Sequence, residues 1–328
     1  MKRKTLLMLK KSKDDFISGE KISDELGISR TAVWKHINTL REEGYKIESM
    51  PKNGYKLLSC PDVLTLEEIE EYLTTDFIGR NIHYFGSIGS TNIKAKEIAM
   101  EEGEGTVIIA EEQTRGKGRL GRDWVSPKGK GIWMSIILKP QMPPSEVAKL
   151  TLIGAAAVNQ GLKQIGLKSH IKWPNDIIIH GKKVCGILTE MSCELNIINY
   201  VIMGIGINVN LGEEDLSQVL ASKATSLKEI TGIDIDRKRL LAMVLNHFED
   251  LYLPFKLEGD ISKSIHISRE NSIIIGKEVR IIRGDTETIG KALDIDEEGQ
   301  LIVEYEGGKR ESIFSGEVSV RGLRGYVE

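Results

Sequence analysis

The sequence predicts an α+β protein with several domains, because its length, its hydrophobic spacing and its turn residues all indicate one. The 328 residues correspond to two or three domains of ordinary size. Helical spacing near the N-terminus gives way to strands and helices without strict alternation between about 80 and 270, and then to short strands alone. This order favours a mixed central sheet over a doubly wound parallel sheet.

The composition is that of a globular protein. Hydrophobic residues make up 40% and charged residues 28%, and the mean hydropathy is -0.19, which excludes a mostly disordered chain. No apolar run approaches the length of about 20 residues that spans a bilayer, and the basic start MKRKTLLMLKKSKDD returns to charge too soon for a secretory signal. Cys60, Cys185 and Cys193 lack the paired spacing of a metal site or a disulfide framework. We therefore expect a cytoplasmic protein.

Residues 18–44 have the pattern of a helix-turn-helix. Gly27 separates two helical stretches, Ser29 suits the N-cap of the second, and Gly44 lies where a glycine commonly ends a helix. The apolar stripe of the second helix consists of Val33, Ile37 and Leu40. The segment therefore predicts two packed helices whose second member has one face free.

A hairpin and a basic surface complete this module. Alternation around Asn53-Gly54 predicts the hairpin, which makes a winged helix-turn-helix. Residues 1–60 hold 13 Lys+Arg against 8 Asp+Glu, whereas the other 268 hold 32 against 40, so an anionic partner is expected for this module alone. The side chains expected to reach phosphates and base edges of DNA are Ser29, Arg30, Thr31, Lys35, His36, Asn38 and Arg41. A small helical bundle with a solvated charged face remains the alternative.

The domain boundaries follow the changes of pattern. We expect a winged helix-turn-helix DNA-binding domain over 1–62, a linker helix over 63–80, a larger domain over 81–270 and a small β-barrel over 271–328. The strands of the larger domain are predicted at 82–86, 106–112, 132–138, 176–180, 183–191 and 198–209, and its helices at 91–102, 146–165 and 237–253. The turns HGKK and ELN join the last three strands and predict an antiparallel meander.

The densest candidate site is QTRGKGRLGRDWVSP, residues 113–127. Its glycines match GxGxxG, but a poor helix sequence follows and no suitable acidic residue stands about twenty positions on, so a Rossmann nucleotide site is not predicted. Its glycines allow close approach to a ligand, its cations can neutralise phosphates, and Trp124 offers a flat face to a purine. The four cations are Arg115, Lys117, Arg119 and Arg122. A solvated basic loop is the alternative.

Three shorter clusters add polar groups. Asn175 and Asp176 could hold Mg²⁺ through oxygen ligands, although taken alone the pair favours a turn. Lys183 could reach a carboxylate or phosphoryl oxygen. Two glycines within 204–210 mark close approach to a strand, and the triplet at 90–92 is either a helix N-cap or a polar site. The six histidines show no metal-ligand spacing.

These clusters, in this order, closely resemble the bifunctional biotin–protein ligases (biotin–[acetyl-CoA-carboxylase] ligases) that also repress the biotin operon. The matching stretches are GSTN (89–92), QTRGKGRLGRDWVSP (113–127), KWPNDI (172–177), GKKVCGIL (181–188), GIGINVN (204–210) and SGEVSVRG (315–322). The resemblance covers essentially the whole chain, and it implies a class II synthetase-like central domain and an SH3-like C-terminal barrel. In one departure, Lys117 stands where the family usually has arginine, which keeps the charge but loses the bidentate fork.

The resemblance also implies an activity and partners. Family members activate biotin with ATP to biotinyl-5′-AMP and then biotinylate one lysine of a biotin carboxyl carrier protein of acetyl-CoA carboxylase or a related carboxylase. With the adenylate bound, the protein would repress the biotin operon. The implied cofactors are ATP, biotin and Mg²⁺. The implied partners are the carrier protein, double-stranded operator DNA and a second copy in an adenylate-bound homodimer, with no membrane.

The resemblance assigns roles to particular residues. The implied catalytic residues are Lys183, Arg119, Arg122 and Asp176. Biotin would be held by Ser90, Thr91, Asn92, Gln113, Gly116, Lys117, Gly118, Arg119, Lys183 and Gly186. ATP or the adenylate would be held by Lys117, Arg119, Arg122, Trp124, Asn175, Lys183 and Asn208. Mg²⁺ would be held by Asn175 and Asp176.

Two other functions stay open at this point, and so does the route to a dimer. A ligand-sensing repressor without catalysis would share the DNA-binding module, but it needs no phosphate-neutralising loop. A lipoyl or octanoyl transferase would share the fold, but KWPND together with the GKGR loop favours biotin.

For assembly, we expect the hydrophobic strand 198–207 to end at an unpaired sheet edge, because such an edge readily accepts a strand from another copy.

Overall fold

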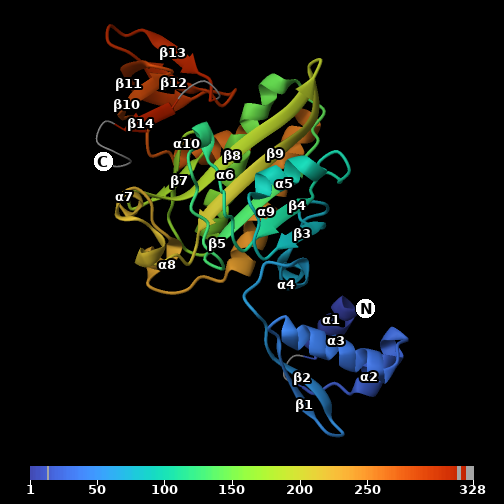
Figure 1. Cartoon of the computed structure of the whole chain (residues 1–328). Coiled ribbons are helices and arrows are strands. Elements are labelled where there is room, and N and C mark those ends of the chain that lie inside the picture. Colours follow the sequence, from blue (N-terminus) through green and yellow to red (C-terminus); the bar gives the residue numbers. More distant parts are fainter. Residues whose placement is uncertain (13–14, 316–318, 323–328) are drawn as a thin grey trace. The chain divides into compact units, whose positions relative to one another are not determined.

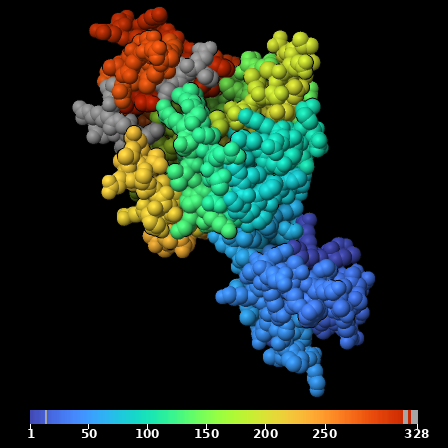
Figure 2. Space-filling model, in the orientation of Figure 1, coloured from blue at the N-terminus to red at the C-terminus, as the bar shows by residue number. Residues whose placement is uncertain are grey.

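The computed structural model describes residues 1–12, 15–315 and 319–322, and it divides into two compact units. The first unit is Met1–Glu71 and the second is Tyr72–Glu328. The first carries the blue shades in Figures 1 and 2, and the remaining colours belong to the second. Within the described residues, no helix is long and apolar enough to cross a membrane.

The first unit is the expected winged helix-turn-helix. Helices α1 (Lys2–Lys11), α2 (Gly19–Leu26) and α3 (Arg30–Glu42) precede the hairpin β1 (Lys46–Met50) and β2 (Gly54–Ser59). Ser29 caps α3 by accepting a hydrogen bond from the backbone N–H of Ala32, and Gly27 ends α2 at φ 64°. The stripe of Val33, Ile37 and Leu40 is buried. The hairpin turn lies at 51–53, so Gly54 already belongs to the strand.

The linker helix expected over 63–80 is wrong. Only α4 (Leu66–Ile69) and the 3₁₀ turn η1 (Glu70–Tyr72) form there. Beyond them, backbone N–H groups find tertiary acceptors instead of helical ones: Thr74 donates to Asn246 at 2.9 Å and Ile78 donates to Glu249 at 2.7 Å. A helix would have used the same donors internally, so side chains far along the sequence decide the local structure here.

A seven-stranded mixed sheet forms the centre of the second unit, in the order β3-β4-β5-β9-β8-β7-β6. The strands are β3 (Ile82–Phe85), β4 (Val107–Ala110), β5 (Gly131–Leu138), β6 (His170–Lys172), β7 (Asp176–Ile179), β8 (Lys182–Glu194) and β9 (Ile197–Asn208). Only β3 and β4 run parallel, and the remaining pairs are antiparallel. The six predicted strands and the meander are confirmed. The three-residue strand β6 was not predicted, because Pro174 leaves it too short for an alternation signal.

Helices cover both faces of this sheet. The helices of the second unit are α5 (Thr91–Ile98), α6 (Val147–Gln164), α7 (Gln218–Ala221), α8 (Leu227–Thr231), α9 (Arg237–Glu258) and α10 (Ser262–Glu270). On β9, Gly204 faces Asn92 of α5, whereas the neighbouring Met203 reaches Gly154 of α6. Successive strand residues point to opposite faces, so α5 lies on one face and α6 on the other, as Figure 1 shows. Helix α9 continues through Pro254 beyond its predicted end, α5 stops before Gly103, and α7, α8 and α10 were not predicted.

The C-terminal part is a five-stranded antiparallel sheet in the order β13-β12-β11-β10-β14. Its strands are β10 (Glu278–Arg283), β11 (Thr286–Ile295), β12 (Leu301–Glu304), β13 (Arg310–Ile313) and β14 (Ser319–Gly322). The antiparallel strands are confirmed, but among the described residues no pairing joins the edge strands β13 and β14 into a closed barrel. Residues 316–318 of SGEVSVRG, and 323–328 of the predicted barrel, lie outside the described residues.

Strand 198–207 is not a sheet edge, so that part of the assembly hypothesis is wrong. It lies within β9, which pairs with β5 on one side and β8 on the other. A continuous apolar sequence shows that both faces of a strand are buried, but it does not show whether the strand lies at the edge or in the centre of the sheet. The sheet instead leaves the second half of β8 open: the last bond to the β7 side runs from Ile187 N–H to Asn175 O at 3.0 Å. Along 188–194, among the residues described, β8 has a strand partner only in β9.

Candidate functional site

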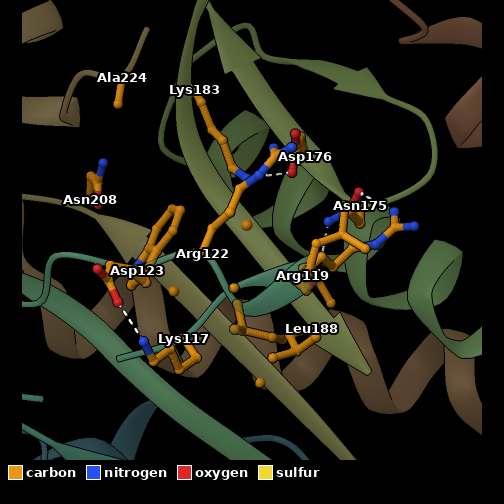
Figure 3. A pocket seen from close by; sticks show the side chains of 18 of the residues that line it. Lys117, Arg119, Arg122, Asp123, Asn175, Asp176, Lys183, Leu188, Asn208 and Ala224 are labelled. Carbon is orange, nitrogen blue, oxygen red and sulfur yellow. Dashed lines mark hydrogen bonds and ion pairs between the residues drawn. The ribbon is translucent and has the colours of Figure 1, made fainter. Parts of the chain in front are cut away.

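The residues singled out from the sequence line one pocket on the α5 face of the sheet (Figure 3). The expected ligand-binding residues found in its wall are Ser90, Thr91, Asn92, Gln113, Lys117, Gly118, Arg119, Arg122, Trp124, Asn175, Asp176, Lys183, Gly186 and Asn208. Arg115, the remaining cation of the loop, is absent from the wall, and so is Gly116. A Cβ there would lie 2.5 Å from the carbonyl oxygen of Trp124, so Gly116 allows the loop to fold tightly rather than touching the pocket.

One end of the pocket gathers cations around a single carboxylate. Lys183 Nζ lies 2.6 Å from Asp176 Oδ1, and Lys172 Nζ lies 3.9 Å from Asp176 Oδ2. Arg122 extends from the loop toward the same part of the pocket (Figure 3). More positive than negative groups are therefore gathered in a partly buried space, an arrangement that suits an anionic ligand.

Arg119 connects the glycine loop with two distant segments. Its guanidinium donates to Asn175 Oδ1 at 3.1 Å and to the carbonyl oxygen of Ser315 at 3.1 Å. Burial is the main cause that lowers its pKa from the usual value, with a further contribution from Arg122 against the opposing effect of Asp176. An arginine stays protonated even so, and a desolvated cation interacts more strongly with an incoming anion.

Trp124 lies flat on the strand floor of the pocket. A Cβ on Gly206 would lie 2.4 Å from its Nε1, and one on Gly186 would lie 3.1 Å from its ring. Lys183 Nζ lies 5.1 Å from the centre of the indole, within cation–π range. The buried Nε1 has no hydrogen-bond partner among the residues that the structure describes. Nearby, Asn208 Nδ2 donates to the carbonyl oxygen of Thr225 at 3.0 Å.

The opposite end of the pocket is lined by polar groups that carry no charge. Gln113 Oε1 accepts from both the backbone N–H and the hydroxyl of Thr91, at 2.9 and 3.1 Å. Ser135 of β5 contacts the Thr91 hydroxyl at 2.8 Å and Asn92 Oδ1 at 2.6 Å. Ser90 occupies the N-cap position of α5, as the triplet predicts, but its side chain makes no cap hydrogen bond, and it also lines the pocket. The geometry suits a neutral ligand group rich in hydrogen-bond donors and acceptors.

Lys117 folds back onto its own loop. Its Nζ lies 2.6 Å from Asp123 Oδ1, and the two residues form an isolated antiparallel bridge. Both side chains are substantially exposed, so this ion pair adds little stability. The lysine that replaces the usual arginine thus has an internal partner that a ligand anion must replace.

Asn175 and Asp176 do not fit a resident magnesium site. Asn175 Oδ1 already accepts from Arg119, while its Nδ2 donates to the carbonyl oxygen of Ile187 at 3.0 Å. Both carboxylate oxygens of Asp176 face lysine ammonium groups. Oxygens directed at cations are poorly placed to ligate another cation. No cluster of three acidic, His or Cys side chains that could hold a metal occurs within residues 1–12, 15–315 and 319–322.

Several residues of this pocket had no assigned role in the sequence analysis. Lys172 begins the KWPND stretch, yet only its neighbours drew attention; it is 7% exposed, and burial is the main cause that lowers its pKa to about 8. Ser135 lies behind the wall, where it contacts Thr91 and Asn92; a buried hydroxyl in the otherwise apolar strand GIWMSIIL is a signal that could have revealed it. Arg280 and Arg321 reach the pocket from the C-terminal sheet.

In the first unit, α3 presents the expected polar face. Thr31 and Lys35 are exposed on it, and Arg30 forms an ion pair with Glu20 of α2. Burial is the main cause that lowers the pKa of His36, helped by the nearby positive groups of Lys2 and the N-terminus. Trp34, for which no role was predicted, is 54% exposed on the same helix.

Arg41 has a different position from the other members of this face. Its guanidinium donates to the carbonyl oxygen of Ile47 at 2.8 and 3.1 Å, and to Asn38 Oδ1 at 3.3 Å. It therefore ties the end of α3 to the first strand of the wing. A contact of Arg41 with DNA stays a prediction, alongside this structural role.

The protein combines a winged helix-turn-helix, a mixed-sheet domain with a cation-lined pocket and a small C-terminal sheet. Together these parts define a class of enzymes that activate a bound substrate and carry a DNA-binding domain. Three family models match the chain in that order. They are the HTH domain over residues 2–56, the Biotin/lipoate A/B protein ligase family over 85–208 and the Biotin protein ligase C terminal domain over 274–321.

Two relatives match nearly the whole chain, and a solved structure matches about three quarters of it. The chain is 42% identical to the bifunctional ligase/repressor BirA of Bacillus spizizenii over 97% of this chain and 98% of that one, and 32% identical to its Escherichia coli counterpart over 94% of each. It also matches a solved biotin protein ligase from Aquifex aeolicus, at TM-score 0.65 and 32% identity over 74% of this chain and 99% of that one. The chain belongs to the family of bifunctional ligase/repressors.

The shifted titration of Lys172 gives a prediction about stability. The folded lysine loses its proton near pH 8, whereas the unfolded one keeps it to about 10.5. Between these values the unfolded state binds more protons, so the free energy of unfolding should rise with pH relative to Lys172→Met, in which this group is absent. Urea unfolding of both proteins from pH 7 to 10.5 measures the difference. A difference that does not change with pH would contradict the lowered pKa.

Proposed function

We propose that the protein activates biotin with ATP to biotinyl-5′-AMP, transfers the biotinyl group to a lysine of a biotin carboxyl carrier protein, and represses transcription while the adenylate is bound. The observation that carries this proposal is the division of the pocket. One end offers neutral hydrogen-bonding groups around Thr91 and Gln113, and the other gathers cations around Asp176. Biotin has a neutral ring at one end and a carboxylate at the other, which must meet the phosphates of ATP.

In the first step, a carboxylate oxygen of biotin attacks the α-phosphorus of ATP, and the bond to pyrophosphate breaks. Both reactants are anions, so catalysis depends on positioning and on charge neutralisation. Lys183, Arg119 and Arg122 are the cations that meet the reacting groups. Asp176 holds Lys183 in place through their 2.6 Å ion pair.

In the second step, the neutral amine of the acceptor lysine attacks the acyl carbon of the adenylate, and AMP leaves. Asp176 is our candidate for taking the proton that the lysine must lose, because only the neutral amine attacks. Adenine would stack on Trp124 near Asn208. Magnesium stays a prediction as an ion carried by the phosphates of ATP, and we assign it no protein ligand.

One assay tests this reaction against its alternatives. The protein is incubated with ATP, labelled biotin and an apo carrier domain, and the label is followed into the carrier. Transfer of lipoate or octanoate in place of biotin would favour an acyltransferase of the same fold, and absence of any transfer would favour a ligand-sensing repressor. We retain the prediction of a cytoplasmic location, where carrier and operator are both available.

Operator binding by the first unit forms the second part of the proposal. The basic module has a helix whose exposed face carries Thr31 and Lys35, and a wing held by Arg41. Specific operators usually contain two half-sites one helical turn apart, which a symmetric dimer reads. We therefore expect the adenylate-bound protein to bind double-stranded operator DNA as a homodimer.

The open half of β8 is the edge that we propose for this homodimer. Residues 188–194 keep one side without a strand partner within the described chain. Met191 is 45% exposed there, and Leu195 and Ile197 beside it are 90% and 65% exposed. Unpaired backbone groups flanked by apolar side chains favour strand addition from another copy. We expect the carrier protein to compete for the same edge.

The cations at the reacting end give a catalytic prediction. Lys183→Ala and Arg119→Ala should each slow biotin-dependent pyrophosphate release by about 10²–10³-fold, because each removes a donor to charge that develops in the transition state. Lys128→Ala, a substitution of an exposed lysine past the loop, is the matched control. Near-normal rates in both pocket variants would contradict the assignment.

DNA binding should depend on the exposed cations of α3. Lys35→Ala should weaken binding to duplex DNA from upstream of the biotin-synthesis genes, and it should lower the salt slope by about one, because one phosphate contact is lost. Lys11→Ala, on the exposed side of α1, serves as control. Binding is titrated with biotin and ATP present at several salt concentrations; an unchanged slope for the Lys35 variant would exclude a phosphate contact there.

Assembly should depend on the open edge of β8. Met191→Lys should weaken the homodimer formed with biotin and ATP, since a lysine on an edge strand opposes strand addition. Ile289→Lys places the same change at another exposed apolar position, on β11, and should have no effect. Sedimentation with and without ligand measures both; equal dimerisation of the two variants would move the interface elsewhere.

A further inference from the structure

The carboxamide of Asn92 is held in one orientation by two side chains that are absent from the pocket wall, Glu190 and Ser135. Asn92 lines the neutral end of the pocket and is 8% exposed. Its Nδ2 donates to Glu190 Oε2 at 2.8 Å, and its Oδ1 lies 2.6 Å from the hydroxyl of Ser135. A carboxylate only accepts hydrogen bonds, so the atom facing Glu190 must be the nitrogen. A hydroxyl can both donate and accept, so Ser135 alone would allow either orientation.

The floor of the pocket leaves this amide little freedom to move away. A Cβ on Gly204 would lie 2.2 Å from Asn92 Oδ1, so the amide lies directly against the backbone of β9. Its remaining N–H and the second lone pair of Oδ1 are then the groups left for a ligand. The hydrogen bond to Glu190 sets the orientation of the amide, and it therefore decides whether the N–H or the Oδ1 lone pair meets a given group of the ligand.

Glu190 is itself fixed from the other side. Lys96 of α5 donates to its second oxygen, Oε1, at 2.6 Å. The neighbouring Thr189 points to the opposite face, where it meets Thr151 of α6 at 2.9 Å. Glu190 therefore projects from β8 toward α5, between a lysine and the amide that it orients.

We propose that Glu190 is a positioning residue for ligand recognition: it sets the orientation of the Asn92 carboxamide that meets the neutral ring of the ligand. The proposal rests on biotin as the ligand of this pocket. Glu190 is absent from the pocket wall and lies outside the cation cluster, so it acts through Asn92 and not on the reacting atoms. Its removal should weaken biotin recognition while leaving the reaction with ATP intact.

The test measures pyrophosphate release as a function of biotin and of ATP. Glu190→Ala should raise the KM for biotin by about ten-fold, the cost of one charged hydrogen-bond partner, with kcat and the KM for ATP within about two-fold of wild type. Glu190→Gln keeps an acceptor for Asn92 and should restore most of the affinity. Glu101→Ala, a change at an exposed glutamate after α5 and away from both the pocket and the open edge, is the control and should alter nothing.

A double-variant cycle separates positioning from a general structural effect. Once Asn92→Ala has removed the amide, adding Glu190→Ala should raise the KM for biotin no further. If Glu190→Ala folds poorly, Glu190→Met keeps the size of the side chain without the acceptor and should give the same result. An unchanged KM in the Ala and Met variants, or a full additional effect in the Asn92→Ala background, would overturn the proposal. Wild-type protein that releases no pyrophosphate with biotin would instead refute the proposed function.

Discussion

The pocket depends on one steric constraint: its floor must lack side chains. At Gly204 and Gly206 of β9, an added Cβ would lie 2.2 Å from Asn92 and 2.4 Å from Trp124. At Gly186 of β8, it would lie 2.9 Å from Lys183 Nζ. Three parts of the pocket therefore approach the paired strands β8 and β9 at glycines. They are Asn92 of the neutral end, the aromatic ring of Trp124 and Lys183 of the cationic end. An alanine at any of these points would displace a residue that the site requires.

Upon this floor, charge is divided along the length of the pocket. Asp176 faces two lysines, while Arg119 is directed to Asn175 and to the carbonyl oxygen of Ser315, after β13. The partial burial of these cations costs free energy that no single carboxylate compensates fully. The lowered pKa of Lys172, about 8, is a direct expression of that cost. An anionic ligand relieves it, so the same arrangement that strains the free protein favours binding of the phosphates of a nucleotide.

Sequence patterns predicted the parts of this molecule that local rules control. The caps Ser29 and Gly27, the meander turns and the apolar strands all express short-range preferences, and they were found as expected. The pocket residues were found through glycine and cation motifs, helped by the resemblance. Sequence reasoning failed where distant partners decide. Glu249 takes the N–H groups that a linker helix would have used, and burial gives Lys172 properties that its neighbours in the sequence do not reveal.

The edge of the sheet is the clearest case of a feature that the sequence alone does not predict. An apolar strand has the same sequence pattern whether it lies at an edge or in the centre, because both environments bury side chains. Only the pairing shows that β9 is central and that β8 is open beyond Ile187. Strand β8 thereby carries residues for three of the proposed roles. Lys183 and Gly186 lie at its start in the pocket, Glu190 contacts Asn92 near its middle, and residues 188–194 form the open edge.

Glu190 belongs to that edge segment, so a strand added there would constrain the backbone of Glu190. The contact between Glu190 and Asn92 would then be a short physical route between assembly and ligand recognition. By linkage, any effect of the ligand on that edge must be matched by an equal effect of pairing on ligand affinity.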